Sequence, residues 1–171
     1  ARAETDGMTL QLSTIQGDAA DMPLPSESFT AISHSDVLCC LEDKLTVLQE
    51  CRRVINADGR MCFTVIRLAD GLKGTAMERA VQAGPEFIHS ETHYPSMLQS
   101  AGWQTIQQDD ITGAFCASIE RMIAAEEKQS ESLRALRGNE ANETAQANWR
   151  YKLQAVVDGL ILGEFFSVVP A

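Results

Sequence analysis

The sequence predicts an α/β fold with a mainly parallel sheet, and three observations carry that prediction. Segments with strand patterns alternate with segments of helical periodicity along most of the chain. The run Arg60–Ile66 is apolar on both faces and contains Val, Ile and Phe, which is typical of a central strand covered on both sides. The chain has 171 residues, 44% of them hydrophobic, which is enough for one domain with a substantial core.

The first third predicts two strands and a helix. Thr9–Gln16 alternates leucine with polar residues and is expected to be a strand, followed by a turn-rich loop. Phe29–Ser33 is a short, mostly apolar run and is expected to be the second strand. Apolar residues recur at helical spacing over Lys44–Ile55, with Asp43 as the expected N-cap. Asn56–Gly59 has turn composition and is expected to end this helix.

The helix and strand pattern continues after Arg60–Ile66. Thr75–Ala83 is expected to be helical, and Pro95–Ala101 is a short helix with proline in its first turn and Gly102 after its end. Trp103–Ile111 is polar enough to be an exposed or edge strand. Two helical stretches separated by Gly138-Asn139 and a last strand at Glu164–Val169 complete the chain.

The charge balance limits the partners. The chain has 14 Lys and Arg against 24 Asp and Glu, a formal net charge of −10. Nucleic-acid binders neutralise phosphates with a basic surface, so no nucleic-acid partner is expected. No run approaches the roughly 18 apolar residues of a membrane helix, so no membrane partner is expected either. Five cysteines without a C-x-x-C pair and three histidines without ligand spacing predict reduced thiols, a cytoplasmic location and no metal.

Residues 17–66 carry an ordered set of short motifs. In chain order these are Gly17-Asp18-Ala19, Met22-Pro23-Leu24, Phe29-Thr30-Ala31-Ile32, Val37-Leu38-Cys39-Cys40-Leu41, Glu50-Cys51-Arg52-Arg53-Val54-Ile55 and Asn56-Ala57-Asp58-Gly59. Their order and spacing resemble the middle of a class I S-adenosylmethionine-dependent methyltransferase of the small-molecule kind. Residues 94–102 resemble the family's segment before its sixth strand. The stretch from Ser33 to Ile55 is similar to the sarcosine/dimethylglycine methyltransferases.

The resemblance implies a fold and a cofactor. The fold is Rossmann-like and lacks its first strands, with helices on both faces of the sheet and a helical insert before the last strand. Residues 1–171 would form a single partial domain, in which residues 112–160 are a helical lid over the acceptor. The cofactor is S-adenosylmethionine, and the family uses the aspartate at the position of Asp18 to accept a hydrogen bond from the adenine amino group.

Further cofactor contacts follow from the same resemblance. The backbone N–H of Ala19 would donate to adenine N1. Ser33 and His34 are expected just past the second strand, where the family contacts the methionine part of the cofactor. From the residues alone, Asp18 is a turn or helix-cap residue and His34 is a loop histidine with satisfied hydrogen bonds. For Asp18 and for His34, the cofactor contact and the structural role both stay open at this point.

The chemistry of methyl transfer limits the catalytic candidates. Transfer from a sulfonium depends mainly on aligning the acceptor atom with the methyl group and the sulfur. A base is needed only where the acceptor carries a proton, and His34 and Asp36 are the nearest candidates; Asp36 is alternatively a cap for the next helix. Arg67 and Tyr94 are candidates to hold an acceptor carboxylate or line its pocket, with a surface salt bridge and a packed ring as their alternatives.

Departures from the family pattern leave the function open between two classes. No glycine-rich G-x-G-x-G loop precedes Asp18, and neither does the acidic residue that usually grips the ribose. The sequence is therefore expected to be a fragment that binds S-adenosylmethionine poorly unless a completing chain or a homodimer restores the sheet. The leading hypothesis is an enzyme that methylates a small molecule, an amine or a carboxylate-bearing metabolite. The alternative is a non-catalytic or partner-dependent module that keeps the scaffold.

Overall fold

The computed structural model describes residues 12–171 and contains a four-stranded sheet. The order across the sheet is β1 (Phe29–Ser35), β2 (Ile55–Leu68), β4 (Ile161–Pro170) and β3 (Trp103–Asp110). β1 pairs parallel with β2, whereas β4 is antiparallel to both β2 and β3. Three strands therefore share one direction, as predicted, although two of the three pairings in this sheet are antiparallel.

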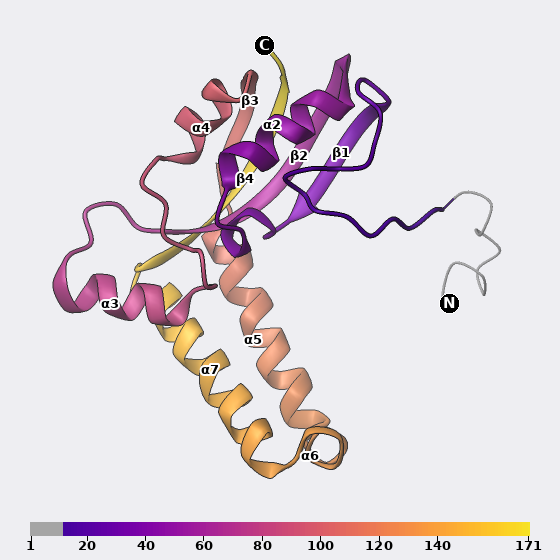
Figure 1. Ribbon diagram of the computed structural model, residues 1–171. Coiled ribbons are helices and arrows are strands. Elements are labelled where there is room, and N and C mark those ends of the chain that lie inside the picture. The colour runs from indigo at the N-terminus through magenta and orange to yellow at the C-terminus, as the bar shows by residue number, and fades with distance from the viewer. Residues whose placement is uncertain (1–11) are drawn as a thin grey trace.

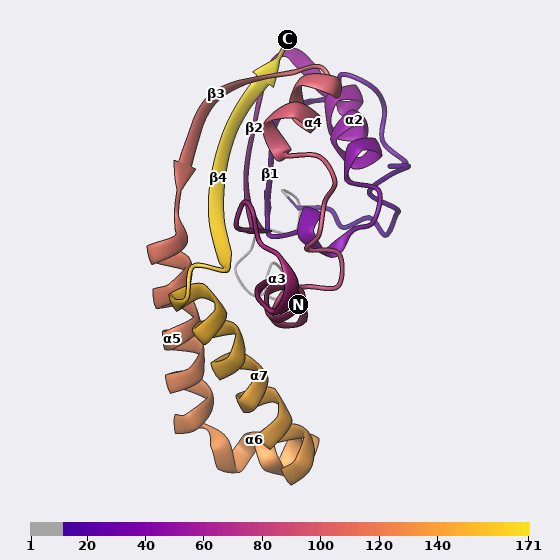
Figure 2. The ribbon, with the colours of Figure 1, turned by 90° about the vertical axis from the view of Figure 1, so that its left-hand side faces the viewer.

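Two helices cover one face of the sheet. α2 (Lys44–Val54) and α4 (Tyr94–Ser100) lie together on the same side (Figure 2). They bury a first core against the strands, and Trp103 anchors it by donating from Nε1 to the Leu48 carbonyl at 3.0 Å. Its fully buried members share an apolar side chain: Leu38, Leu48, Ile55, Met61, Phe63, Val65, Leu98, Phe166 and Val168.

The opposite face of the sheet corrects one expectation. Helices were predicted on both faces, but in Figure 2 none of the described helices covers the face opposite α2 and α4. In β2 the side chains of Met61, Phe63 and Val65 are buried, whereas Cys62 and Thr64 between them are only half-buried. Burial along this part of β2 therefore alternates, whereas the prediction had both faces buried. The prediction failed because cysteine and threonine resemble core residues in sequence but lie on the open face here.

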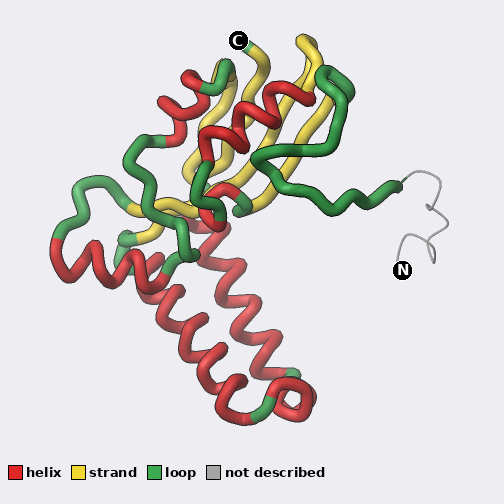
Figure 3. The backbone as a smooth tube through the Cα atoms, in the orientation of Figure 1, coloured by secondary structure: helices red, strands yellow, loops and turns green. Residues whose placement is uncertain are grey.

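The remaining helices form a second core at the end of the sheet. α3 (Gly74–Ala83) packs beside a helical hairpin made of α5 (Thr112–Lys128), α6 (Ser130–Arg137) and α7 (Asn139–Val157). The hairpin projects away from the sheet (Figures 1 and 3). Its apolar contacts gather around Ile119, Ala155 and Val156. The helical insert predicted before the last strand is confirmed, with Gly138 between α6 and α7 as expected.

Most element predictions are confirmed with shifted ends. The Asp43 side chain caps α2 by accepting from Thr46 N at 3.0 Å, and β3 is an edge strand whose residues after Trp103 are exposed. The strand predicted at Thr9–Gln16 is wrong where it can be judged: residues 12–16 form no strand, and residues 9–11 lie outside the described part. A short 3₁₀ helix, η1 (Leu38–Cys40), follows β1. No helix in the described part has both the length and the hydrophobicity to cross a bilayer.

The turn predicted at Asn56–Gly59 is instead an irregularity within β2. Phe29 pairs with Ile55, but Ala31 pairs with Arg60, so β2 accommodates extra residues where it begins beside β1. Gly59 sits at this bulge, and a Cβ added to it would lie 2.4 Å from Ile55 Cγ1. A close approach of this kind requires glycine. The turn-like composition of residues 56–59 is therefore explained by a β-bulge.

Replacing Gly59 by alanine should destabilise the fold. The new methyl group would overlap the fully buried Ile55, and overpacking of this kind costs about 1–3 kcal/mol. Gly113→Ala is the matched control, because a Cβ there meets nothing within 4 Å and should leave stability unchanged or raise it. Urea unfolding of the wild type and the two variants measures the difference in free energy of unfolding. Equal midpoints for Gly59→Ala and wild type would contradict the close contact between Gly59 and Ile55.

Candidate active site

The site begins where β1 and β2 end, at the edge of the sheet called here the carboxyl edge. Asp36 follows β1 with a φ of 53°, a left-handed conformation that is uncommon for residues other than glycine. Thr64 on β2 holds it: Thr64 Oγ1 donates to Asp36 Oδ1 at 2.9 Å, and Asp36 N donates to the Thr64 carbonyl at 3.0 Å. A residue held in such a backbone conformation at a strand end is a functional candidate.

Asp36 does not have the alternative role of a helix cap. The residue before η1 is Val37, and no side chain caps this helix. The Asp36 carbonyl accepts from the thiols of Cys39 and Cys40 at 3.2 and 3.6 Å, while its carboxylate turns to Thr64. The side chain is therefore directed by the neighbouring strand.

A cavity lies between the carboxyl edge and the helical hairpin. Two adjoining hollows share Asp36, Ile66, Phe115 and Ser118, so α5 forms their roof. Trp149 and Lys152 from α7 complete the lining, with the Lys152 ammonium 5.3 Å from the centre of the Trp149 ring. The cavity thus combines an apolar wall with one acidic and one basic group.

A second cavity of about 150 Å³ contains Arg67 and Tyr94, the two residues predicted to contact an acceptor. Both of their alternatives also occur in the structure. Arg67 Nε lies 2.9 Å from Glu164 Oε1 and its Nη1 lies 3.3 Å from Asp70 Oδ1, so its charge is already balanced. Tyr94 is a packed ring, only 3% exposed, yet its hydroxyl has no hydrogen-bond partner among the described residues.

A row of rings, which the sequence did not reveal, connects His34 to Tyr94. His34 stacks on Phe63 with centroids 4.8 Å apart, Phe63 stacks on Phe166 at 5.2 Å, and Phe166 meets Tyr94 at 6.2 Å. The row crosses β1, β2 and β4 and ends on α4. Its two ends carry buried polar atoms without partners in the described part, namely both His34 nitrogens and the Tyr94 hydroxyl.

Burial fixes the protonation of both end groups. Burial lowers the pKa of His34 to about 4, so its imidazole is neutral at pH 7. Burial, followed by the nearby Cys39 and Glu164, raises the pKa of Tyr94 well above its usual value, so the phenol keeps its proton. Both groups are therefore neutral at pH 7.

Ser33 and His34 are not placed as the sequence predicted. Both were expected beyond the strand, but β1 continues to Ser35 and includes them. Consecutive residues of a strand point to opposite faces, so His34 faces the first core while Ser33 is exposed on the open face. A single ligand at the carboxyl edge cannot contact both side chains in the same way.

The loop with Asp18 and Ala19 forms a tight turn. Asp18 Oδ1 accepts from Ala20 N at 2.9 Å, and Asp21 N donates to the Asp18 carbonyl at 3.2 Å. Ala19 and Ala20 pack against the first core, whereas Asp18 itself is exposed. The turn role therefore occurs, and it uses one of the two carboxylate oxygens. The residues fit the adenine end of the implied cofactor, because an exposed carboxylate next to a backbone N–H offers the required acceptor and donor.

Comparison with known proteins gives matches in sequence and in fold. Residues 1–63 match the family model described as "Methyltransferase domain". The phosphoethanolamine N-methyltransferase of Triticum aestivum is 22% identical over 137 residues, which are 80% of this chain and 27% of that protein.

Two solved structures share the fold. A putative sarcosine dimethylglycine methyltransferase from Galdieria sulphuraria superimposes with a TM-score of 0.88 at 18% identity, over 98% of this chain and 62% of that one. Phosphoethanolamine N-methyltransferase 2 of Haemonchus contortus, in complex with phosphomonomethylethanolamine and S-adenosylhomocysteine, gives 0.76 at 17% identity, over 90% of this chain and 36% of that one.

These matches confirm the resemblance and the fold. The chain has the α/β fold of the class I methyltransferases, and it resembles their small-molecule members in sequence as well as in structure. It spans between about a quarter and two thirds of the length of these relatives.

Removing the Tyr94 hydroxyl should not destabilise the protein. A buried hydroxyl without a partner carries a desolvation penalty of about 1–3 kcal/mol, so Tyr94→Phe should unfold at the same or a higher urea concentration. Tyr94→Ala, which also removes the ring against Phe166, should lose about 3–5 kcal/mol. A clear loss of stability in Tyr94→Phe would mean that the hydroxyl is bonded within the protein, and would remove it from the site.

Proposed function

We propose that the protein transfers a methyl group from S-adenosylmethionine to a small-molecule acceptor. The observation that carries this proposal is the position of Asp36. It occupies a constrained conformation at the end of a strand and lines the cavity under the hairpin, within a methyltransferase fold. In open α/β sheets, ligands bind beyond the carboxyl ends of the strands.

The chain's own residues would bind the cofactor at its adenine end. Bound S-adenosylmethionine supplies an electrophilic methyl group on a sulfonium. The free oxygen of the Asp18 carboxylate would accept from the adenine amino group, and Ala19 N would donate to the ring. Ser33 and His34 remain proposed contacts for the rest of the cofactor. Because their side chains point to opposite faces, the backbone of β1 is the part that both residues could offer to the same ligand.

The acceptor would lie at the carboxyl edge. We propose that Asp36 orients a polar acceptor group and accepts its proton where it carries one, because Asp36 faces a cavity. His34 is the second candidate, because its buried imidazole is neutral at pH 7. Tyr94 and the Arg67–Glu164 pair would set the polarity of the second cavity. The names of the relatives refer to amines, which supports an amine acceptor.

The proposed partners follow from charge and from the free edge of the sheet. A net charge of −10 favours a small acceptor over a nucleic acid. β1 ends the order of the described sheet, and its outer backbone groups are available for further strands, from another part of the same protein, a completing chain or a second copy. The five cysteines are unpaired, as a reducing compartment would keep them, which supports a cytoplasmic location.

A non-catalytic, partner-dependent module is the second candidate. The open sheet face and the free edge of β1 favour it, because both offer surfaces that another chain could cover. The two candidates differ in one measurable property, since only the enzyme binds S-adenosylmethionine or its product when the sheet is complete.

Asp18→Ala should weaken the binding of S-adenosylhomocysteine by about 1–3 kcal/mol, which corresponds to the loss of a hydrogen bond in a binding site. The test uses calorimetry on the longest version of the protein that its coding sequence specifies. Asp18→Asn is the informative comparison, because its amide oxygen can still accept from Ala20 N but the side chain no longer provides a carboxylate to the ligand.

The outcomes separate the two roles of Asp18. Weakened binding in both variants, with unfolding midpoints near the wild-type value, supports the adenine contact. Wild-type affinity in Asp18→Asn combined with weak binding in Asp18→Ala assigns a turn role only. A wild-type protein without affinity for S-adenosylhomocysteine overturns the enzyme proposal in favour of the module.

A further inference from the structure

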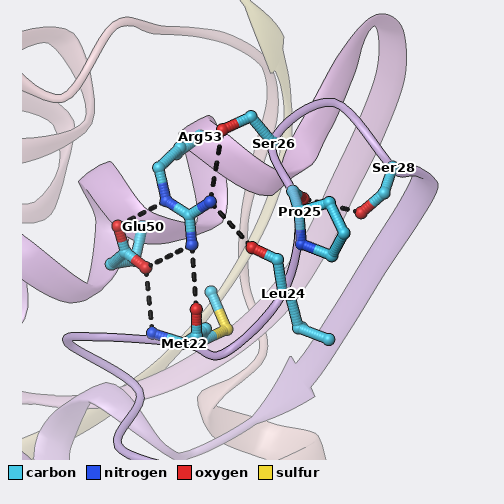
Figure 4. A network of polar contacts seen from close by, with 7 residues as sticks. All are labelled: Met22, Leu24, Pro25, Ser26, Ser28, Glu50 and Arg53. Carbon is cyan, nitrogen blue, oxygen red and sulfur yellow. Dashed lines mark hydrogen bonds and ion pairs between the residues drawn. The ribbon is translucent and has the colours of Figure 1, made fainter.

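The Glu50–Arg53 pair near the end of α2 makes a concentrated set of contacts to a distant loop. Arg53 Nε and Nη2 donate to the two carboxylate oxygens of Glu50, each at 2.8 Å (Figure 4). Arg53 Nη1 donates to the Leu24 carbonyl at 2.8 Å and to Ser26 Oγ at 3.2 Å, and Nη2 donates to the Met22 carbonyl at 3.0 Å. Glu50 Oε2 in turn accepts from Met22 N at 2.9 Å.

These contacts fix both polar groups of one loop residue. Met22 N donates to the Glu50 carboxylate and the Met22 carbonyl accepts from Arg53, so the ion pair binds both backbone polar groups of this residue. The planar guanidinium also donates to the Leu24 carbonyl, and it is a rigid fork that presents its donors in fixed directions. The side chains of Arg53 and Glu50 are 35% and 16% exposed, so the pair is partly shielded from water.

The fixed segment lies directly after the Asp18 turn. The bond from Asp21 N to the Asp18 carbonyl closes that turn, and Met22 is the next residue. On the other side, Glu27 N and Ser28 N donate to the Arg53 and Val54 carbonyls at 2.9 and 2.8 Å. The loop is therefore held at Met22 and Leu24 by side chains, and at its far end by the backbone of α2. The end that carries Asp18 is held by the packing of Ala19, Ala20 and Met22 on the first core, and by the hydrogen bonds of the pair at Met22.

We infer that Glu50 and Arg53 are positioning residues that hold the Asp18 and Ala19 turn in place for the cofactor. This inference rests on the proposed function, because the proposed function is what assigns S-adenosylmethionine to this turn. The pair touches neither cofactor nor acceptor and acts through Met22. A turn already held in its bound position binds without first being ordered, so losing the pair weakens affinity.

The test compares Arg53→Lys and Glu50→Gln with Arg52→Lys. Lysine keeps the charge but cannot bond two carbonyls and a carboxylate in one plane, and glutamine keeps the shape without the charge. Arg52 is the neighbouring half-buried arginine on the same helix, so its replacement controls for any change at this part of α2. The measurements are hydrogen exchange of the amides of residues 18–26, affinity for S-adenosylhomocysteine and thermal unfolding, all on the full protein.

Three results are expected together. Exchange at residues 18–26 should rise about tenfold or more in both pair variants, because charged hydrogen bonds that order the loop are lost. The dissociation constant for S-adenosylhomocysteine should rise about five- to tenfold because the turn is no longer held in its bound position. The unfolding midpoint should fall as well, because the ion pair with its depressed Glu50 pKa also stabilises the folded state. Arg52→Lys should match wild type in all three measurements.

The failures are distinguishable. Unchanged exchange in the pair variants overturns the inference, because the loop would then be held by other contacts. Faster exchange with wild-type affinity also overturns it and leaves the pair a structural role. If the wild-type protein itself does not bind S-adenosylhomocysteine, the proposed function fails and the cofactor step fails with it, while the exchange data still show whether the pair holds the loop.

The pair should also keep the loop in place to low pH. Hydrogen bonds from Arg53, and then from Met22 N, lower the pKa of Glu50 from 4.5 to about 2. A carboxyl with a depressed folded pKa contributes stability that is fully present above its unfolded pKa and is lost as the pH falls through the folded value. The contribution should therefore persist down to about pH 4.5 and disappear towards pH 2.

The amide chemical shift of Met22 measures this transition. In the wild-type protein it should titrate with a midpoint near 2, and in Glu50→Gln it should not move in that range. A midpoint near 4.5 would show that Glu50 is free of Arg53 in solution.

Discussion

The pairing of β2 with β4 positions the rest of the molecule. Eight consecutive residue pairs join the two strands, from Met61 opposite Val168 to Leu68 opposite Ile161. This register places Phe63 directly against Phe166, and the resulting stack carries His34 at one end and Tyr94 at the other. The register also places Glu164 opposite Val65, two positions from Arg67, so that the carboxylate reaches the guanidinium. A shift of β4 by one residue would turn Phe166 and Glu164 to the opposite face of the sheet and break both contacts.

Local signals made several elements of this fold predictable. Asp43 and the apolar spacing after it define α2, and proline at the start of α4 with Gly102 beyond its end defines that helix, because caps act within a few residues. Features that depend on a distant partner were not predictable. The alternation at residues 12–16 forms no strand, since strand geometry requires hydrogen bonds from a neighbour. His34 and Ser35 extend β1 beyond its predicted end at Ser33 despite their polar character, because Phe63 and Thr64 on β2 pair with them.

The candidate site shows the same division. The sequence could nominate Asp36, Arg67 and Tyr94 by residue type, since carboxylates, guanidiniums and phenols are the groups that such chemistry uses. It could not show that Arg67 is already paired with Glu164. These residues are 97 positions apart in the sequence, and the antiparallel pairing of β2 with β4 brings them together. Glu50 and Arg53 were visible as part of a motif, yet their role depends on Met22 and Leu24, at sequence separations of 28 to 31 residues.

The two cores meet at the carboxyl edge, and each fixes a different part of the site. The first core, beneath α2 and α4, positions His34 and Tyr94 and contacts Ala19 and Ala20 from the loop that carries Asp18. The second core sets Phe115 and Trp149, which roof the cavity above Asp36. Asp36 itself is held by Thr64 from the strand between them. A substitution in the hairpin should therefore alter the cavity beside Asp36 without moving the Asp18 loop, because the contacts that hold this loop lie on the α2 side of the sheet.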